Sequence, residues 1–388
     1  MKINRSLYSW ALYDFANTIF SAVVLTFHFP LYLTGFTHRN IHLGVVTTMA
    51  MVLAGLTVPW LGALSDRTGK AKEYLIRTTI FCVGFTALLS LFTTVPLLMG
   101  IFILACFFFH ASLVFYNALL PAVADEKTQG FASGLGTGLG YLGVVFSIPA
   151  AYFISSIYGE RYVFLSAAVL FLVFSLPLFF WVPEKKTKGI SSSQNVFQTV
   201  QSVARKPSLF LFFLGNFFVM EALNTVIFWL IIYMARVFNP PQSKLVLVFL
   251  SFNFSAFLFG LVAGILINRW GSRKTFLLAA LALFITILGL GLTRNFRLFV
   301  LGGVLGGGFS FAGIWTAGRK RVVELAPSEE VGIYFGFYSL TTKISVFFSL
   351  IFSLLADRFG FQTALLTLAI PSGLGFSVLF FANSSQPR

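Results

Sequence analysis

Hydrophobic and polar positions alternate along the chain in long blocks. Apolar stretches of about 19–29 residues follow one another with short polar breaks between them. Each is long enough to cross the roughly 30 Å hydrocarbon core of a bilayer as a helix, and a helix satisfies its own backbone hydrogen bonds in lipid. The pattern therefore predicts an all-α integral membrane protein with twelve transmembrane helices. The expected spans are 8–34, 41–63, 75–95, 97–120, 131–156, 161–182, 208–236, 244–267, 275–293, 298–318, 331–356 and 361–382.

The composition supports this prediction. Of 388 residues, 57% are hydrophobic and only 10% are charged, whereas a soluble domain carries about 25% charged residues. The chain thus has too few polar side chains to cover a surface that faces water. Its two cysteines, Cys82 and Cys106, lie inside apolar stretches, as expected of small buried hydrophobic residues rather than of a disulfide or a metal site.

The net charge of +15 raises the question of a nucleic-acid partner. Such a partner requires basic residues gathered on one face, and here they are scattered between apolar stretches. With the N-terminus in the cytoplasm, the loops on that side contain 19 Lys and Arg residues against 7 on the other side. This bias predicts that both termini are cytoplasmic and that no nucleic acid is bound.

The longest polar stretch, residues 183–207, separates the first six spans from the last six. We therefore expect an N-terminal bundle over 1–182, a cytoplasmic linker, and a C-terminal bundle over 208–388. Apolar residues recur at helical spacing from Val196 to Val203. The linker could form a short amphipathic helix on the membrane surface, or it could be a plain connection.

The two halves repeat each other. "GALSDRTGKAK" at 62–72 corresponds to "GILINRWGSRK" at 264–274 at an offset of 202, and "YDFANTIF" at 13–20 corresponds to "MEALNTVI" at 220–227 at an offset of 207. Duplicated halves of a transporter share a site near the bilayer midplane. This favours alternating access over a fixed pore.

The loop between spans 2 and 3 closely resembles the signature loop of the major facilitator superfamily. The resemblance implies that fold and a gating role for the loop, whereas a tight polar turn is the simpler interpretation. Because Asn268 replaces the acid in the second copy, we expect that copy to gate less strongly. The gating candidates are Gly62, Asp66, Arg67, Gly69 and Lys70 in the first copy, and Asn268, Arg269 and Gly271 in the second.

A narrower resemblance is to the vacuolar amino-acid effluxers linked to autophagy and their bacterial relatives. "SWALYDFANT" at 9–18 and "FGFYSLTTK" at 335–343 are similar to the signatures of that group. Arg319 also fits its pattern, whereas Glu221 and Trp315 depart from it. The resemblance implies transport of a small organic solute across a bacterial inner membrane.

Charged residues inside the predicted spans are the main candidates for function. Asp14, Glu221 and Lys343 lie within apolar stretches, and a charge at the centre of a membrane helix costs about 2.5–3.5 kcal/mol. Such groups require a hydrated cavity or mutual pairing. Helical spacing adds polar residues on the same helix faces. The candidate cavity residues are Asp14, Asn17, Ser21, His28, His110, Asn117, Glu221, Asn224, Trp315, Arg319 and Lys343.

Several roles remain open for these residues. Asp14 and Glu221 could carry protons, because burial favours a neutral carboxyl group. Lys343 could bind a substrate carboxylate while an acid takes the ammonium, or it could form a static ion pair with Glu221. We expect His28 and His110 to form interhelical hydrogen bonds rather than proton relays.

The glycine pattern "GLGYLG" at 138–143 matches a dinucleotide-binding motif, but it lies inside a span without the strand that the motif requires. We interpret its glycines as sites of close helix packing. The glycines concerned are Gly134, Gly136, Gly138, Gly140 and Gly143.

Together these features predict a secondary active transporter, coupled to protons and acting as a monomer in membrane lipid. An amino acid or a similar metabolite is the favoured substrate. No enzymatic, metal or cofactor motif is found in the sequence. A multidrug or siderophore exporter is the alternative within the class, and a non-transporting receptor or scaffold is the alternative outside it.

Overall fold

The computed structural model describes residues 5–37, 40–184, 205, 207–344 and 346–381. All regular structure in these ranges is helical, and ten of the described helices are long and apolar enough to cross a membrane. Two of the expected spans are not among these ten. The third, expected over 75–95, is the shorter helix Ala71–Leu88, which ends seven residues early and includes the charged residues Lys72, Glu73 and Arg77 in its first turns. The eleventh, expected over 331–356, is described as two shorter helices on either side of residue 345, which lies outside the described residues.

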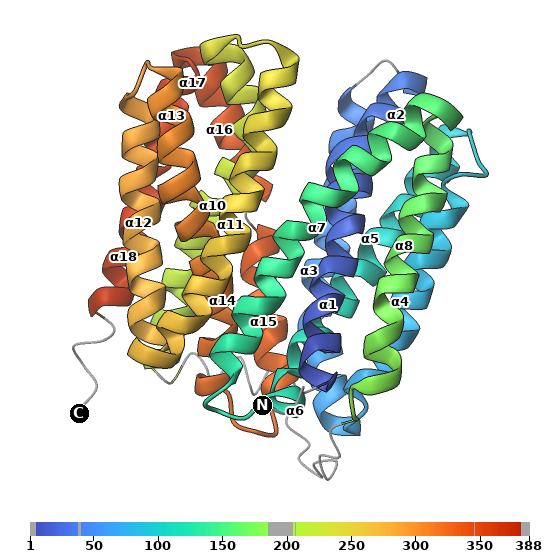
Figure 1. Cartoon of the computed structure of the whole chain (residues 1–388), viewed down its shortest axis with the longest axis vertical. Helices are drawn as coiled ribbons and strands as arrows, with labels where there is room; N and C mark the ends of the chain where they lie inside the picture. Colours follow the sequence, from blue (N-terminus) through green and yellow to red (C-terminus); the bar gives the residue numbers. More distant parts are fainter. Residues whose placement is uncertain (1–4, 38–39, 185–204, 206, 345, 382–388) are drawn as a thin grey trace.

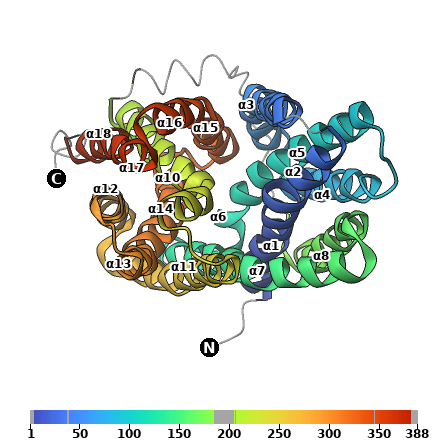
Figure 2. The ribbon, with the colours of Figure 1, turned by 90° about the horizontal axis from the view of Figure 1, so that it is seen from above.

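The first six spans form an N-terminal bundle (Figures 1 and 2). The first span is a continuous helix whose middle part, Phe20–His28, is π-helical. The elements are α1 (Arg5–Ile19), η1 (Phe20–His28), α2 (Phe29–Thr37), α3 (Asn40–Thr68), α4 (Ala71–Leu88), α5 (Val95–Ala118), α6 (Leu120–Val123), α7 (Gln129–Tyr158) and α8 (Glu160–Trp181).

The second six spans form a C-terminal bundle, in which the tenth and twelfth spans consist of consecutive helical segments. The elements are α10 (Pro207–Phe238), α11 (Gln242–Trp270), α12 (Ser272–Leu292), α13 (Phe296–Gly302), η2 (Gly303–Gly307), α14 (Gly308–Leu325), α15 (Val331–Ile344), α16 (Val346–Phe359), α17 (Phe361–Thr367) and α18 (Ala369–Phe381). The expected all-α membrane fold of two six-helix bundles is confirmed. Most of the linker, residues 185–204 and 206, lies outside the described residues, so its amphipathic helix stays a prediction.

Each bundle has its own aromatic core. In the N-terminal bundle Tyr13 stacks on Tyr116 with ring centroids 5.1 Å apart. In the C-terminal bundle Tyr233 stacks on Phe299 at 5.3 Å. Large apolar side chains such as Leu56 and Phe180 are exposed on the outside, as expected where lipid is the solvent.

The bundles meet at one end of the molecule, the lower end in Figure 1, where α1 begins and α3 ends. Above it their ribbons diverge (Figure 1), although Phe27 still contacts Phe249 with ring centroids 5.7 Å apart. Helices of the two bundles pack together at this end, among them α3 with α15, α7 with α11 and α14, and α5 with α15. The molecule is therefore joined most closely at that end.

Glycines permit these close approaches, as predicted. A Cβ atom at Gly134 of α7 would lie 2.6 Å from the carbonyl oxygen of Gly260 in α11. On another face of α7, the same addition at Gly136 or Gly143 would bring Cβ within 2.9 Å of α1 atoms. Helix α7 thus packs against α1 in its own bundle and α11 in the other.

Candidate functional site

The acid of the first motif is joined to the other bundle. Asp14 of α1 accepts a hydrogen bond from Nη1 of Arg319 in α14, with 2.9 Å between Oδ2 and nitrogen. Its second oxygen accepts from the amide of Asn17, one turn later, at 3.0 Å. Both charged side chains are almost buried, with 9% of Asp14 and 11% of Arg319 exposed. Asp14 and Arg319 therefore form a buried ion pair between the two bundles.

The pair lies beside two aromatic rings. Trp10 and Tyr116 stack with centroids 4.5 Å apart, and the guanidinium carbon of Arg319 lies 5.4 Å from each centroid. The rings stabilise the cation by cation–π attraction. Trp10 was not predicted as a site residue, although it stands one turn before Asp14 on the same helix face. Tyr116 precedes the candidate Asn117 in the sequence.

Among the described residues, helix α14 makes two further polar contacts with the N-terminal bundle, both to α7. Ser133 donates to the carbonyl oxygen of Thr316 at 2.9 Å, and Lys320 donates to Oε1 of Gln129 at 2.9 Å. The predicted tenth span ends at residue 318, with the basic residues 319–321 in a loop. In the structure α14 continues as a helix to Leu325, and Arg319 and Lys320 are buried in it.

Glu221, the counterpart of Asp14 in the second half, has a different environment. It is fully buried in α10 between core residues Met220 and Ala222. Its Oε1 accepts from Thr225 at 3.1 Å, whereas Oε2 has no hydrogen-bond partner among the described residues. Asn224, its predicted companion, is half-buried. The repeated motif thus gives a paired acid in one bundle and a largely unpaired acid in the other.

The predicted histidines and Ser21 lie apart from this pair or bond locally. His28 pairs with Glu160 in its own bundle, with 2.6 Å between Nδ1 and Oε2, and it is about 21 Å from Asp14 by helical rise. His110 is buried edge-to-face against Phe109, with centroids 5.0 Å apart. Ser21 donates to the carbonyl oxygen of Thr18 at 3.2 Å. The hydrogen bond of His28 to Glu160 fits the structural role expected for it.

Two more candidates belong to the C-terminal bundle. Trp315 of α14 contacts Tyr338 of α15 edge-to-face at 6.4 Å between ring centroids. Lys343 belongs to α15, but its side chain lies outside the described residues. Its predicted roles stay predictions.

The signature loop contacts the opposite bundle. The carboxylate of Asp66 accepts the backbone N–H of Gly332 at 2.9 Å and that of Ile333 at 2.8 Å. Both amides belong to the first turn of α15, where unpaired N–H groups and the helix dipole favour an anion. Gly62 permits the approach, since a Cβ there would lie 2.2 Å from the carbonyl oxygen of Gly332. Asp66 therefore holds α3 against α15.

The second copy repeats this geometry without the charge. Gly264 packs on Gly130, whose carbonyl oxygen would be 3.0 Å from an added Cβ. Gly130 lies in the first turn of α7, at the same offset of 202 from Gly332 that separates the two loops. A Cβ atom added to Gly130 would lie only 2.5 Å from the Oδ1 atom of Asn268. A neutral amide thus occupies the position that the Asp66 carboxylate has in the first copy.

The remaining loop residues are compatible with a tight turn as well as with a gate. Gly69 and Gly271 adopt φ angles of 65° and 84°, a region that only glycine enters without strain. Arg67 and Arg269 are exposed, and Lys70 pairs with Glu73 at 3.1 Å in a surface ion pair. The turn shapes the loop, and Asp66 makes the contact between bundles.

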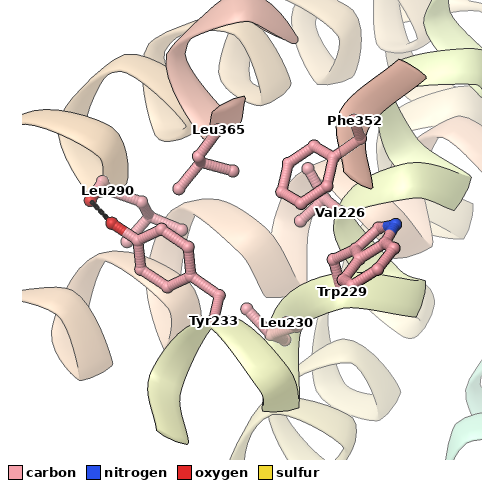
Figure 3. Close-up of a pocket in the computed structure, with 7 residues that line it drawn as sticks. All are labelled: Val226, Trp229, Leu230, Tyr233, Leu290, Phe352 and Leu365. Atoms are coloured by element: carbon pink, nitrogen blue, oxygen red, sulfur yellow. Dashed lines mark hydrogen bonds between the residues drawn. The ribbon is translucent and has the colours of Figure 1, made fainter. Parts of the chain in front are cut away.

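A small apolar pocket lies elsewhere, inside the C-terminal bundle (Figure 3). Its one polar contact among the side chains drawn is a hydrogen bond from the Tyr233 hydroxyl to the Leu290 carbonyl oxygen at 3.4 Å. It has no group that could bind a charged solute. The lining residues are Val226, Trp229, Leu230, Tyr233, Leu290, Phe352 and Leu365.

Comparison with known proteins gives the same superfamily as the resemblance of the signature loop. The family model of the Major Facilitator Superfamily matches residues 12–249 and 221–388. The chain belongs to this superfamily. It is therefore a membrane transporter rather than an enzyme, and the resemblance of its signature loop is confirmed at the level of the superfamily.

Three similar proteins illustrate the relationship. The uncharacterised MFS-type transporter YxiO of Bacillus subtilis (strain 168) is 25% identical over 404 residues, covering 96% of this chain and 94% of its own. The human organic anion transporter MFSD10 matches with a TM-score of 0.79 at 14% identity, over 98% and 100% of the two chains. FucP in the outward conformation also matches with a TM-score of 0.79, at 13% identity over 99% and 98%. Each of these two solved structures thus shares the fold of this chain.

Proposed function

We propose that the protein is a proton-coupled secondary transporter of a small organic solute, an amino acid or a similar metabolite. The observation that supports this most strongly is the Asp14–Arg319 pair. It places one acid and one base, both desolvated, at the boundary between two bundles that must separate in alternating access. A static scaffold would gain little from such a pair, because burying two charges costs about as much as their attraction returns.

The contacts at the lower end give the proposal its mechanism. Three kinds of contact join the bundles there. Asp66 of α3 bonds to α15, the glycines of α7 pack against α11, and Arg319 bonds to Asp14. With the topology predicted from loop charges, that end faces the cytoplasm, so the arrangement corresponds to an outward-facing state. The same contacts break when the bundles rock to expose the site inward.

Glu221 is the candidate for proton coupling. A charged carboxylate with one oxygen unpaired and fully buried would bear a desolvation cost. The neutral acid avoids that cost, and the proposal therefore assigns a proton to Glu221 in this arrangement. Release of this proton requires Glu221 to reach water, which a rocking motion of the bundles supplies. Lys343 stays a candidate for an additional contact with the solute.

The experiment is uptake into proteoliposomes with an imposed pH gradient. Amino acids that stabilise the purified protein against heat are taken as the solutes. We expect concentrative uptake with the gradient and only equilibration after a protonophore is added. Uptake that is unaffected by the protonophore would refute proton coupling, and the absence of flux for every solute tried would refute the transport proposal and favour a scaffold.

A further inference from the structure

Buried oxygen atoms without a protein partner gather beside the Asp14–Arg319 pair. In the described part of the chain, no hydrogen-bond partner is found for Asn117 Oδ1, Thr137 Oγ1 or Thr316 Oγ1. Each unpaired buried polar atom costs about 1–3 kcal/mol, and native proteins satisfy most such atoms with water or a ligand. Three of them on the helices that hold the ion pair indicate a binding site rather than isolated packing defects.

Their positions follow from contacts that converge on the pair. A Cβ atom added to Gly136 would lie 2.8 Å from Oδ2 of Asp14 and 3.1 Å from the Tyr116 hydroxyl. Thr137 is the next residue of α7. Thr316 stands one turn before Arg319 in α14, and its carbonyl oxygen accepts from Ser133 of α7, one turn before Thr137. The three unpartnered oxygens therefore belong to α5, α7 and α14, each within about one turn of a residue that contacts the ion pair or carries its charge.

The chemistry of these atoms is of two kinds. The hydroxyls of Thr137 and Thr316 can donate hydrogen bonds, as a carboxylate requires. The amide oxygen of Asn117 can only accept, as an ammonium group requires. Donors and an acceptor thus accompany a cation and an anion, Arg319 and Asp14.

We infer that a zwitterionic α-amino acid inserts into the Asp14–Arg319 pair, its carboxylate on Arg319 and its ammonium on Asp14. Insertion leaves every buried charge with an opposite partner, so no uncompensated charge arises. An anion alone would leave Asp14 unpaired, and an amine alone would leave Arg319 unpaired. The inference rests on the proposed transport function and adds the substrate class and its binding groups.

The insertion also links binding to movement. While Asp14 bonds Arg319 directly, α1 and α14 are held at 2.9 Å between charged atoms. A substrate between them replaces this one contact with two direct ion pairs, one at each end of its backbone, and thereby moves the two helices apart. Binding therefore releases one of the contacts that close the lower end.

The test begins with the purified full-length protein in detergent. Each of the twenty common L-amino acids is screened for thermal stabilisation, and each one that stabilises is compared with its N-acetyl derivative, which is an anion, and with its decarboxylated amine. We expect only the zwitterion to stabilise. Equal stabilisation by the anion or by the amine overturns the inference, as does a screen in which no amino acid stabilises.

Variants separate a substrate role from a structural role. Thr137→Val should weaken binding about tenfold or more, since a hydrogen bond to a charged group is lost, and Thr137→Ser should restore it. Ser147→Ala is the control, because it removes another buried hydroxyl of α7 without a partner among the described residues. Unchanged binding in Thr137→Val contradicts the site and leaves its oxygens to buried water.

A double charge reversal, Asp14→Arg with Arg319→Asp, completes the design. It restores an ion pair and therefore thermal stability relative to either single variant, but it places each charge away from its hydrogen-bonding neighbours. We expect a folded protein that no longer binds the amino acid. Binding as tight as in the unsubstituted protein overturns the inference. If uncharged solutes are transported with a proton gradient instead, the transport function stands and the zwitterion site fails.

Discussion

Arg319 donates to the carboxylate of Asp14 at 2.9 Å, although 305 positions separate them in the chain. The bond joins α1 of one bundle to α14 of the other, and the guanidinium lies over the Trp10 and Tyr116 rings. A single contact thus combines the two features expected of a transport site, buried charge and a position between the bundles.

Removal of the acid alone should destabilise the protein. Asp14→Asn leaves Arg319 with a buried charge and a neutral partner, and breaking a buried ion pair costs about 3–5 kcal/mol. We expect a lower midpoint of thermal unfolding in detergent. Combining Asp14→Asn with Arg319→Gln removes both charges and should recover most of the loss. A double variant less stable than either single variant would contradict the pairing.

The two loop copies should respond oppositely to exchange of acid and amide. Asp66→Asn removes the charge from the first turn of α15 and should weaken closure by about 0.3–1 kcal/mol, whereas Asn268→Asp adds a charge at the first turn of α7 and should strengthen it. Spin labels at exposed Arg67 and Glu329 report the separation of the lower end. The native cysteines Cys82 and Cys106 are buried and need no replacement. Identical distance distributions in all three proteins would show that the loops do not gate.

Closure should also depend on the absence of a side chain at Gly62. Gly62→Ala places a Cβ 2.2 Å from the Gly332 carbonyl oxygen, so the lower end cannot close as seen. We expect at least a tenfold loss of transport with little change in folding. Gly84→Ala is the matched control, since no atom of the described structure lies within 4 Å of its added Cβ. Equal losses in both variants would indicate a general effect of substitution.

Glu221→Gln should separate stability from coupling. If Glu221 is neutral in the closed arrangement, the isosteric amide replaces it with little change in unfolding midpoint. Proton-driven accumulation should be lost, because the amide cannot release a proton. Exchange of labelled for unlabelled solute, which requires no net proton movement, should continue. A large loss of stability, or accumulation that persists, would contradict the role of Glu221.

The sequence predicts the fold well, because membrane spans are long apolar stretches that need no knowledge of their partners. It also predicts the contact surface of α7, since its glycines fall on two helix faces that pack against α1 and α11. The bounds of the third span are predicted less well, because the helix begins at Ala71 and includes the charged residues Lys72, Glu73 and Arg77, and it ends at Leu88 although the apolar stretch continues.

The ion pair could be predicted only in part. Asp14 stands out as an acid inside a span, but Arg319 begins a run of three basic residues, which is typical of a cytoplasmic loop. Only the packing of α14 against α7 shows that this run continues a helix and is largely buried. Hydroxyl residues such as Thr137 give no signal in a sequence, because most threonines in membrane helices bond to their own backbone.

Cross-linking the lower end tests the central claim most directly. Arg67→Cys and Glu329→Cys place reactive thiols on the two bundles, and a cleavable bifunctional maleimide joins them in proteoliposomes. If the contacts at this end must separate during transport, uptake falls to the background of empty vesicles and returns when the linker is cleaved. Uptake at the full rate through cross-linked protein would contradict alternating access through this end.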